Sequence, residues 1–292
     1  MALRVITKGL LLLLLCGGVQ QVDAGARGAA AVRKQAESSL RVSGEIVLRP
    51  DGSVLSHTLD PQAPLGEPLS RFVGDAVGNW RFKPVLVDGR PATVKVPMSL
   101  RLVAKPADDG KINVSIASTH FGSKDDVPAT DNPRSVQMNP PRFPKNALYM
   151  GGKGTVYLVV QIGRDGKVAN VDAEQVNLRV AGTENQMAML RKQFTMAAVN
   201  TARGWTFDIP TTGETANDKH WLVRVPVEFV LTGPGEKKSN KSGWDTYIPG
   251  PRNIAMPWAQ EQLRTAGSPD ALPDAGIYPL REGAELLTPP TT

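Results

Sequence analysis

The stretch "VRVPVEFVLT", residues 223–232, has a near copy in "VKVPMSLRLV", residues 94–103. In both copies a Val–basic–Val–Pro run is followed by apolar residues that alternate with polar ones. Alternation with a period of two is typical of a β-strand with one buried face. The agreement over ten positions predicts that the chain contains a repeated unit.

The residues before the second copy predict a β-β-α-β unit. Apolar residues alternate along "GTVYLVVQIG", residues 154–163, and Asp165-Gly166 supplies the turn into a second strand. Apolar residues at three- and four-residue spacing predict a helix over 186–203, which ends before Gly204. The final strand is then the stretch at 223–232.

The residues before the first copy follow the same order. A hairpin is predicted around "PDG", residues 50–52, and an amphipathic helix follows it. The segments "NWRFKP" and "GWTFDIP" align Trp80 with Trp205 and Phe82 with Phe207. Each Trp closes the apolar stripe of a helix, so we expect both to pack in a core. We therefore expect an α+β protein with two small domains, each an antiparallel sheet with a helix packed on one face.

The N-terminus is typical of an exported protein. Arg4 and Lys8 precede a short apolar run, and small residues lead to Ala24, which predicts a signal peptide over residues 1–24 and a periplasmic mature chain. An inner-membrane anchor through residues 9–19, or a lipid on Cys16, is the alternative. Cys16 is the only cysteine, so cleavage would leave no disulfide.

The remaining segments set the expected domain layout. The tail after Gly233 is rich in Pro, Gly, Ser and Thr and is predicted to be disordered or extended. Its aromatic residues Trp244, Tyr247 and Trp258 could bind a partner or fold back onto a domain. The layout is a linker at 25–41, a truncated domain at 42–104, a linker with one strand-like run at 105–139, a full domain at 140–232 and the tail at 233–292.

Residue patterns for catalysis or cofactor binding are missing from the sequence. His57, His120 and His220 have no second ligand at a metal-binding spacing, so we expect no metal. The sequence has no Gly-x-Ser-x-Gly elbow, and "MGGKGT" at 150–155 leads into a strand rather than a helix, which favours a glycine turn over a phosphate loop. The net charge of +6 is scattered among acidic residues, which argues against nucleic-acid binding. We expect a protein that is not an enzyme and has no cofactor.

The segment "PPRFPKNALYMGGKGTVYLVVQIGRDGKVANV", residues 140–171, contains a Pro-x-Phe-Pro start, a short Ala-containing stretch, a glycine turn and a Val-rich strand that runs to Asp-Gly. With the helix near 186–203, "WTF" at 205–207 and "VRVPVEF" at 223–229, it resembles the C-terminal domain of the TonB energy-transducer family. The resemblance covers residues 140–232. Residues 42–103 resemble a shorter copy that lacks the Pro-x-Phe-Pro start.

The resemblance implies a periplasmic domain that binds an extended segment of an outer-membrane receptor along its last strand. Such strand addition uses main-chain hydrogen bonds. Pro226 suits an edge strand, where it either permits partner binding or only protects the edge from aggregation. The expected partner-binding residues are Val223, Arg224, Val225, Pro226, Val227, Glu228 and Phe229.

The sequence also departs from the family pattern. Family members that transmit force have an N-terminal membrane helix with a histidine, followed by a long Pro-rich spacer, and no histidine precedes His57 here. We therefore expect a tandem TonB-like periplasmic protein that binds a partner peptide by edge-strand addition, in receptor-linked transport, and contacts membranes only through its partners. The alternative is an envelope structural or assembly protein whose domains self-associate without energy transduction.

Overall fold

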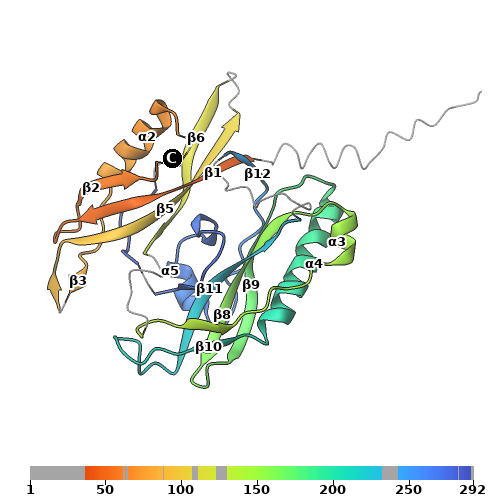
Figure 1. Cartoon of the computed structure of the whole chain (residues 1–292). Helices are drawn as coiled ribbons and strands as arrows, with labels where there is room; N and C mark the ends of the chain where they lie inside the picture. Colours follow the sequence, from red (N-terminus) through yellow and green to blue (C-terminus); the bar gives the residue numbers. More distant parts are fainter. Residues whose placement is uncertain are drawn as a thin grey trace, which may run out of the picture.

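The computed structural model describes residues 37–61, 63, 65–87, 89–106, 111–122, 130–231, 243–281 and 283–290. The predicted signal peptide, the alternative anchor at 9–19 and residues 25–36 of the predicted linker lie outside the described residues. Two antiparallel sheets, each with a helix on one face, lie on either side of the C-terminal segment (Figure 1). The predicted α+β class is confirmed.

The first unit is a sheet in which β1 pairs with β5, and β5 pairs with β6 along its other side. The helix α2 packs on one face, and Pro68 lies in its first turn. The elements of this unit are β1 (Glu37–Leu48), β2 (Val54–Leu59), α2 (Glu67–Gly78), the short hairpin of β3 (Leu86–Val87) and β4 (Arg90–Pro91), β5 (Val94–Pro106) and β6 (Ile112–Phe121).

Two segments predicted to be linkers contain strand. β1 begins at Glu37, inside the predicted linker at 25–41, because the buried side chain of Leu40 extends the alternating pattern of this strand. β6 lies inside the predicted linker at 105–139, and its residue Ile116 is buried in the first core. The first unit therefore has β6 and the short strands β3 and β4 in addition to the three strands of the predicted β-β-α-β unit.

The second unit is a sheet with the order β13-β11-β8-β9. The helix α4 packs on it and begins with a capping box, in which the Thr183 hydroxyl accepts from the Gln186 N–H while the Gln186 side chain accepts from the Thr183 N–H. The elements are β7 (Arg134–Gln137), α3 (Lys145–Tyr149), β8 (Gly154–Gly163), β9 (Val168–Leu178), α4 (Glu184–Ala202), β10 (Thr206–Asp208) and β11 (His220–Phe229).

The two units have the same hydrogen bond between a glycine of the first hairpin turn and a phenylalanine that follows the helix. Gly52 has a φ of 80° and its carbonyl accepts from the Phe82 N–H at 2.8 Å. Gly166 has a φ of 73° and its carbonyl accepts from the Phe207 N–H, also at 2.8 Å. A side chain at either glycine would meet the phenylalanine carbonyl, so both turns need a residue without Cβ. The sequence alignment of the two phenylalanines thus corresponds to equivalent positions in space.

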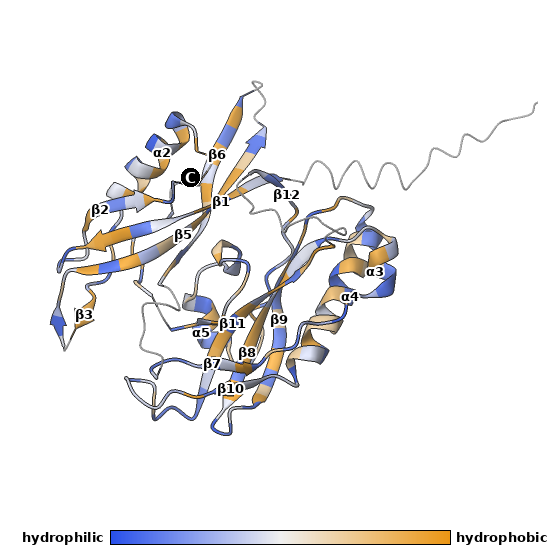
Figure 2. Ribbon diagram, viewed as in Figure 1, coloured by the Kyte–Doolittle hydropathy of each residue, from blue (hydrophilic) through white to orange (hydrophobic). Residues whose placement is uncertain are grey.

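Each unit has its own apolar core between sheet and helix. Trp80 and Trp205 are both buried in these cores, as expected. The Trp205 indole N–H donates to the Asn139 carbonyl at 3.0 Å. Figure 2 shows hydrophobic segments alternating with more polar ones along β1 and β5, which is the pattern of strands with one face in a core.

The C-terminal segment is folded, and the prediction of a disordered or extended tail was wrong for residues 243–281 and 283–290. Met256, Ala259 and Leu263 pack with Val159 and Leu222 on the face of the second sheet opposite α4. The fold-back alternative describes this segment, since Tyr247 is buried and Trp258 packs against the same cluster. Its elements are β12 (Asp245–Tyr247), α5 (Gln260–Thr265), the 3₁₀ turn η1 (Pro269–Ala271) and β13 (Tyr278–Pro279).

The helices of the described ranges are short or amphipathic. Within this part of the chain, none combines the length and the apolar character needed to cross a bilayer.

Candidate peptide-binding strand

The predicted binding strand is β11, and it lies next to the end of its sheet. β11 pairs with β8 along its whole length, from His220 opposite Gly163 to Phe229 opposite Gly154. Among the described residues, its other side pairs with β13 at two positions, and the Leu280 N–H is bonded to it as well. In the described part of the chain, β11 thus lies next to the end of its sheet, beside a short piece of the C-terminal segment.

The side chains of the predicted site divide between the two faces of the sheet. Val223, Val225, Val227 and Phe229 point to the α4 side and belong to the core of the second unit. Arg224, Pro226 and Glu228 alternate with them and face the C-terminal segment. Most of the seven side chains are buried, so an added strand would be recognised mainly through the backbone of β11.

Arg224 is held inside the protein by Glu174 of β9. Two guanidinium nitrogens of Arg224 donate to the two carboxylate oxygens of Glu174, each at 2.8 Å, and one also donates to the Gly267 carbonyl. Arg252 donates to the same carboxylate at 2.6 Å. Burial lowers the pKa of Arg224, and the Glu174 carboxylate opposes this effect. Arg224 therefore fastens the tail to the sheet.

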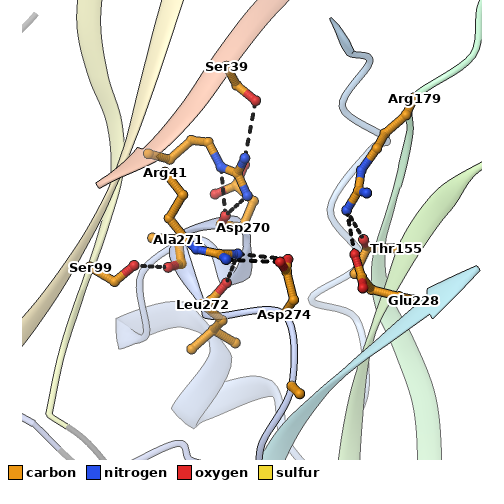
Figure 3. A network of polar contacts seen from close by, with 12 residues as sticks. Ser39, Arg41, Ser99, Thr155, Arg179, Glu228, Asp270, Ala271, Leu272 and Asp274 are labelled. Carbon is orange, nitrogen blue, oxygen red and sulfur yellow. Dashed lines mark hydrogen bonds and ion pairs between the residues drawn. The ribbon is translucent and has the colours of Figure 1, made fainter. Parts of the chain in front are cut away.

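Glu228 lies near the other end of β11 and is also paired. Arg179 donates to the Glu228 carboxylate at 2.8 Å and to the Thr155 hydroxyl at 3.1 Å. Figure 3 shows Arg179 pointing toward both groups. The pair is mostly shielded from solvent, with the Glu228 side chain 14% exposed. Both charged residues of the predicted site thus have structural partners.

A second group of polar contacts joins the tail to the first unit (Figure 3). Arg41 forms a bidentate ion pair with Asp274, with N–O distances of 2.7 and 2.9 Å. The Ser99 hydroxyl donates to the Ala271 carbonyl at 2.7 Å. The tail residues Ala271 and Asp274, which precede β13, are therefore bonded to the first sheet, whereas β13 itself pairs with the second.

The backbone groups on the outer side of β11 can be assigned from one hydrogen bond. The Leu280 N–H donates to the Leu222 carbonyl at 3.0 Å, so the Leu222 backbone faces β13. Along an antiparallel strand the backbone groups of successive residues point to opposite sides. The N–H and C=O groups of Arg224 and Glu228 therefore face the same side of β11 as those of Leu222. Pro226 faces it too and has no N–H to donate, and the pairing with β13 ends at Arg224, two positions before Pro226.

In the first unit, the side of β5 that is equivalent to the outer side of β11 is paired with another strand. β5 occupies the position of β11, and β6 pairs with it from Met98 to Pro106. Pro97 lies just outside that ladder, beside the Gly122 N–H that donates to its carbonyl. In the part of the chain that the structure describes, the corresponding place beside β11 holds the short strand β13 and Leu280. Two equivalent strands in one chain thus differ in how far their outer side is paired.

The histidines do not form a metal centre within the described ranges, where no group of three or more His, Cys, Asp or Glu side chains could hold an ion. His120 contacts the ring of Tyr278 with centroids 5.3 Å apart. Burial, together with the nearby Arg224, lowers the pKa of His120 to about 4. Its neutral ring packs where β6 meets the tail.

Two curated proteins from strains of Xanthomonas campestris pv. campestris, both named protein TonB, are each 33% identical to this chain over 107 residues. This chain is similar to TonB. The similarity covers 36% of this chain, and the chain spans 41% of the length of each TonB relative. No family model and no solved structure matches the chain. The likeness to TonB supports the family resemblance for about a third of the chain.

Sequence reasoning found the strand but missed what surrounds it. The Arg224–Glu174 pair joins residues fifty positions apart, and β13 joins the tail to a strand more than fifty positions earlier. The only sequence signal for the added strand was "IYPL" at 277–280, an apolar run in a segment rich in turn residues. A run this short does not distinguish a strand from a loop.

Proposed function

We propose that this chain is a TonB-like protein on the periplasmic side of the bacterial envelope. In this proposal the second unit binds an extended segment of an outer-membrane protein as a strand added to β11. The similarity to TonB supports a role linked to energy-dependent transport across the outer membrane. The observation that carries the proposal is the pairing of β11, which has a full-length neighbour on one side and, among the described residues, the short β13 with Leu280 on the other.

Strand addition fits the chemistry of this edge. An added strand gains main-chain hydrogen bonds, and these do not require exposed side chains on β11. β6 is an example of a strand bound along the equivalent side of β5 in the same chain. Pro226 has a carbonyl that can accept a hydrogen bond but no N–H that can donate one. We therefore expect the partner carbonyl opposite Pro226 to receive no hydrogen bond from β11.

The experiment uses the mature chain and synthetic peptides that copy the N-terminal segments of outer-membrane receptors from the same organism. Binding is measured by fluorescence polarisation for the native protein and for two variants. Glu228→Pro removes an N–H that faces the outer side of β11, and Glu228→Gln keeps that N–H while losing the same charge and ion pair. Proline at Val225 or Val227 is unsuitable, because those N–H groups face β8 and proline would break the ladder.

The expected result is measurable binding by the native chain and by Glu228→Gln, with binding by Glu228→Pro reduced at least about tenfold, the size of effect that loss of one or two backbone bonds produces. Circular dichroism and urea unfolding confirm that both variants fold. If no receptor peptide binds the native chain, and size-exclusion chromatography shows a dimer, the proposal fails in favour of the assembly alternative.

A further inference from the structure

The short segment Ile277–Arg281 differs from the residues on both sides of it in what it contacts. Before it, Asp274 is bonded to Arg41 of the first unit. After it, the Glu285 carbonyl accepts from the Lys83 N–H at 2.9 Å, again in the first unit. Between these anchors the chain crosses to the second unit and pairs with β11. We call residues 277–281 the strap.

Glycines lie near both ends of the strap. Gly276 has a φ of 136° and Gly283 a φ of 101°, two conformations that residues with a side chain rarely adopt. A Cβ on Gly276 would come within 2.7 Å of the Tyr278 hydroxyl, and one on Gly283 within 1.9 Å of the Phe121 carbonyl. Both turns therefore depend on glycine, the residue with the greatest freedom to change conformation. The strap thus lies between two glycines, and the residues on both sides of it are bonded to the first unit.

The hold of the strap on β11 is short. Among the described residues, the backbone pairing consists of the pairs Val223–Pro279 and Arg224–Tyr278, together with the bond from the Leu280 N–H to the Leu222 carbonyl. The side chain of Tyr278 adds apolar contact, since it is buried against Tyr157 and Leu272. The strap also packs the partly buried Ile277 against the second core and Leu280 against the cluster around Met256. By contrast β6, the equivalent neighbour of β5, is paired along most of its length and contributes the buried Ile116 and Phe121 to the first core.

We propose that the strap is a releasable intramolecular strand, which occupies the outer side of β11 in the absence of a partner. A partner strand then reaches the backbone of Leu222 and Arg224 only after the strap has left. The inference rests on the proposed function for what replaces the strap, but release itself is a property of this chain and is measured without a partner.

Native-state hydrogen exchange tests release in the unmodified mature chain. The Arg224 N–H faces the strap, whereas the N–H groups of Val223 and Val225 face β8. Local release predicts that the Arg224 and Leu280 amides exchange together, at least about tenfold faster than those of Val223 and Val225, and with little dependence on low denaturant concentrations. Equal protection and equal denaturant dependence at all four amides would overturn the proposal.

A matched pair of proline variants tests the strap bond directly. Leu280→Pro removes the N–H that donates to the Leu222 carbonyl, and Leu287→Pro removes the N–H of the same tail that donates to the Arg81 carbonyl at 2.8 Å. The expected result is at least about tenfold faster exchange of the Arg224 amide in Leu280→Pro only. An unchanged Arg224 amide in Leu280→Pro, or the same acceleration in both variants, contradicts a separate strap.

A disulfide then links release to peptide binding. Val223 and Pro279 form the non-hydrogen-bonded pair of this ladder, where side chains come closest. In the mature chain, which is predicted to begin after Ala24 and so to have no cysteine of its own, Val223→Cys with Pro279→Cys should bind receptor peptides at least about tenfold more weakly when oxidised than when reduced. Equal binding in the two states contradicts the strap as a barrier. If neither state binds, the proposed function fails, and the exchange data alone decide on the strap.

Discussion

The guanidinium group of Arg224 lies against the carboxylate of Glu174, with both N–O distances at 2.8 Å and Glu174 completely buried. Because Arg252 binds the same carboxylate, one negative charge serves two positive ones. Removing the shared charge should therefore be more harmful than removing an ordinary ion pair.

We predict that Glu174→Gln lowers the free energy of unfolding by about 3–5 kcal/mol, because it leaves two buried or half-buried arginines without a counter-charge. Urea unfolding followed by circular dichroism measures this. The control is Glu285→Gln, which removes the exposed partner of Lys83 and should cost less than about 1 kcal/mol. Equal losses in the two variants would show that the buried carboxylate is not central to the tail contact.

The hairpin turn at Gly166 gives a second prediction. Gly166→Ala should destabilise the protein by about 1–3 kcal/mol, because a Cβ there would meet the Phe207 carbonyl at 2.3 Å in a left-handed backbone conformation. Gly78→Ala is the matched control, since nothing lies within 4 Å of its Cβ position at the end of α2. Thermal unfolding of both variants checks the contrast, and a similar melting temperature for the two would contradict it.

The capping box at the start of α4 gives a third prediction. Thr183→Ala removes the hydroxyl that accepts from the Gln186 N–H and should lower the free energy of unfolding, measured in urea, by about 1 kcal/mol. Thr183→Ser keeps a hydroxyl at the same position and should lower it by at most a few tenths of that amount. If the serine variant loses as much stability as the alanine variant, packing of the threonine methyl group, rather than capping, explains the effect.

His120 gives a prediction about pH. Its pKa in the folded chain is about 4, below the ordinary value of 6.5, so the unfolded chain binds more protons between these pH values. The contribution of His120 to the free energy of unfolding is therefore fully present above pH 6.5. It is lost as the pH falls toward 4, by at most about 1.4 kcal/mol per pH unit. Urea unfolding from pH 4 to 7.5 should show a shallower slope in His120→Gln than in the native chain. Parallel slopes would contradict the buried neutral state.

The predicted binding site illustrates where sequence reasoning ends. The pattern "VRVPVEF" correctly separates Val223, Val225 and Val227 from the residues between them, because a period of two is a local property of a strand. It does not reveal that Arg224 pairs with Glu174, since that contact depends on how β11, β8 and β9 are aligned. β9 shifts register twice against β8, and no sequence pattern placed these bulges.

By itself the sequence determined the local structure: the Asp-Gly turns, the helix predicted over 186–203 and observed at Glu184–Ala202, and the alternating strands, each of which depends on residues within a few positions of one another. Only the tertiary structure decided that the tail is folded and that it lies between the two sheets. The contacts responsible, such as Arg41 with Asp274, join residues more than two hundred positions apart. Their formation depends on surfaces that exist only after each sheet has assembled, and this is also what decides how much of β11 a partner strand can reach.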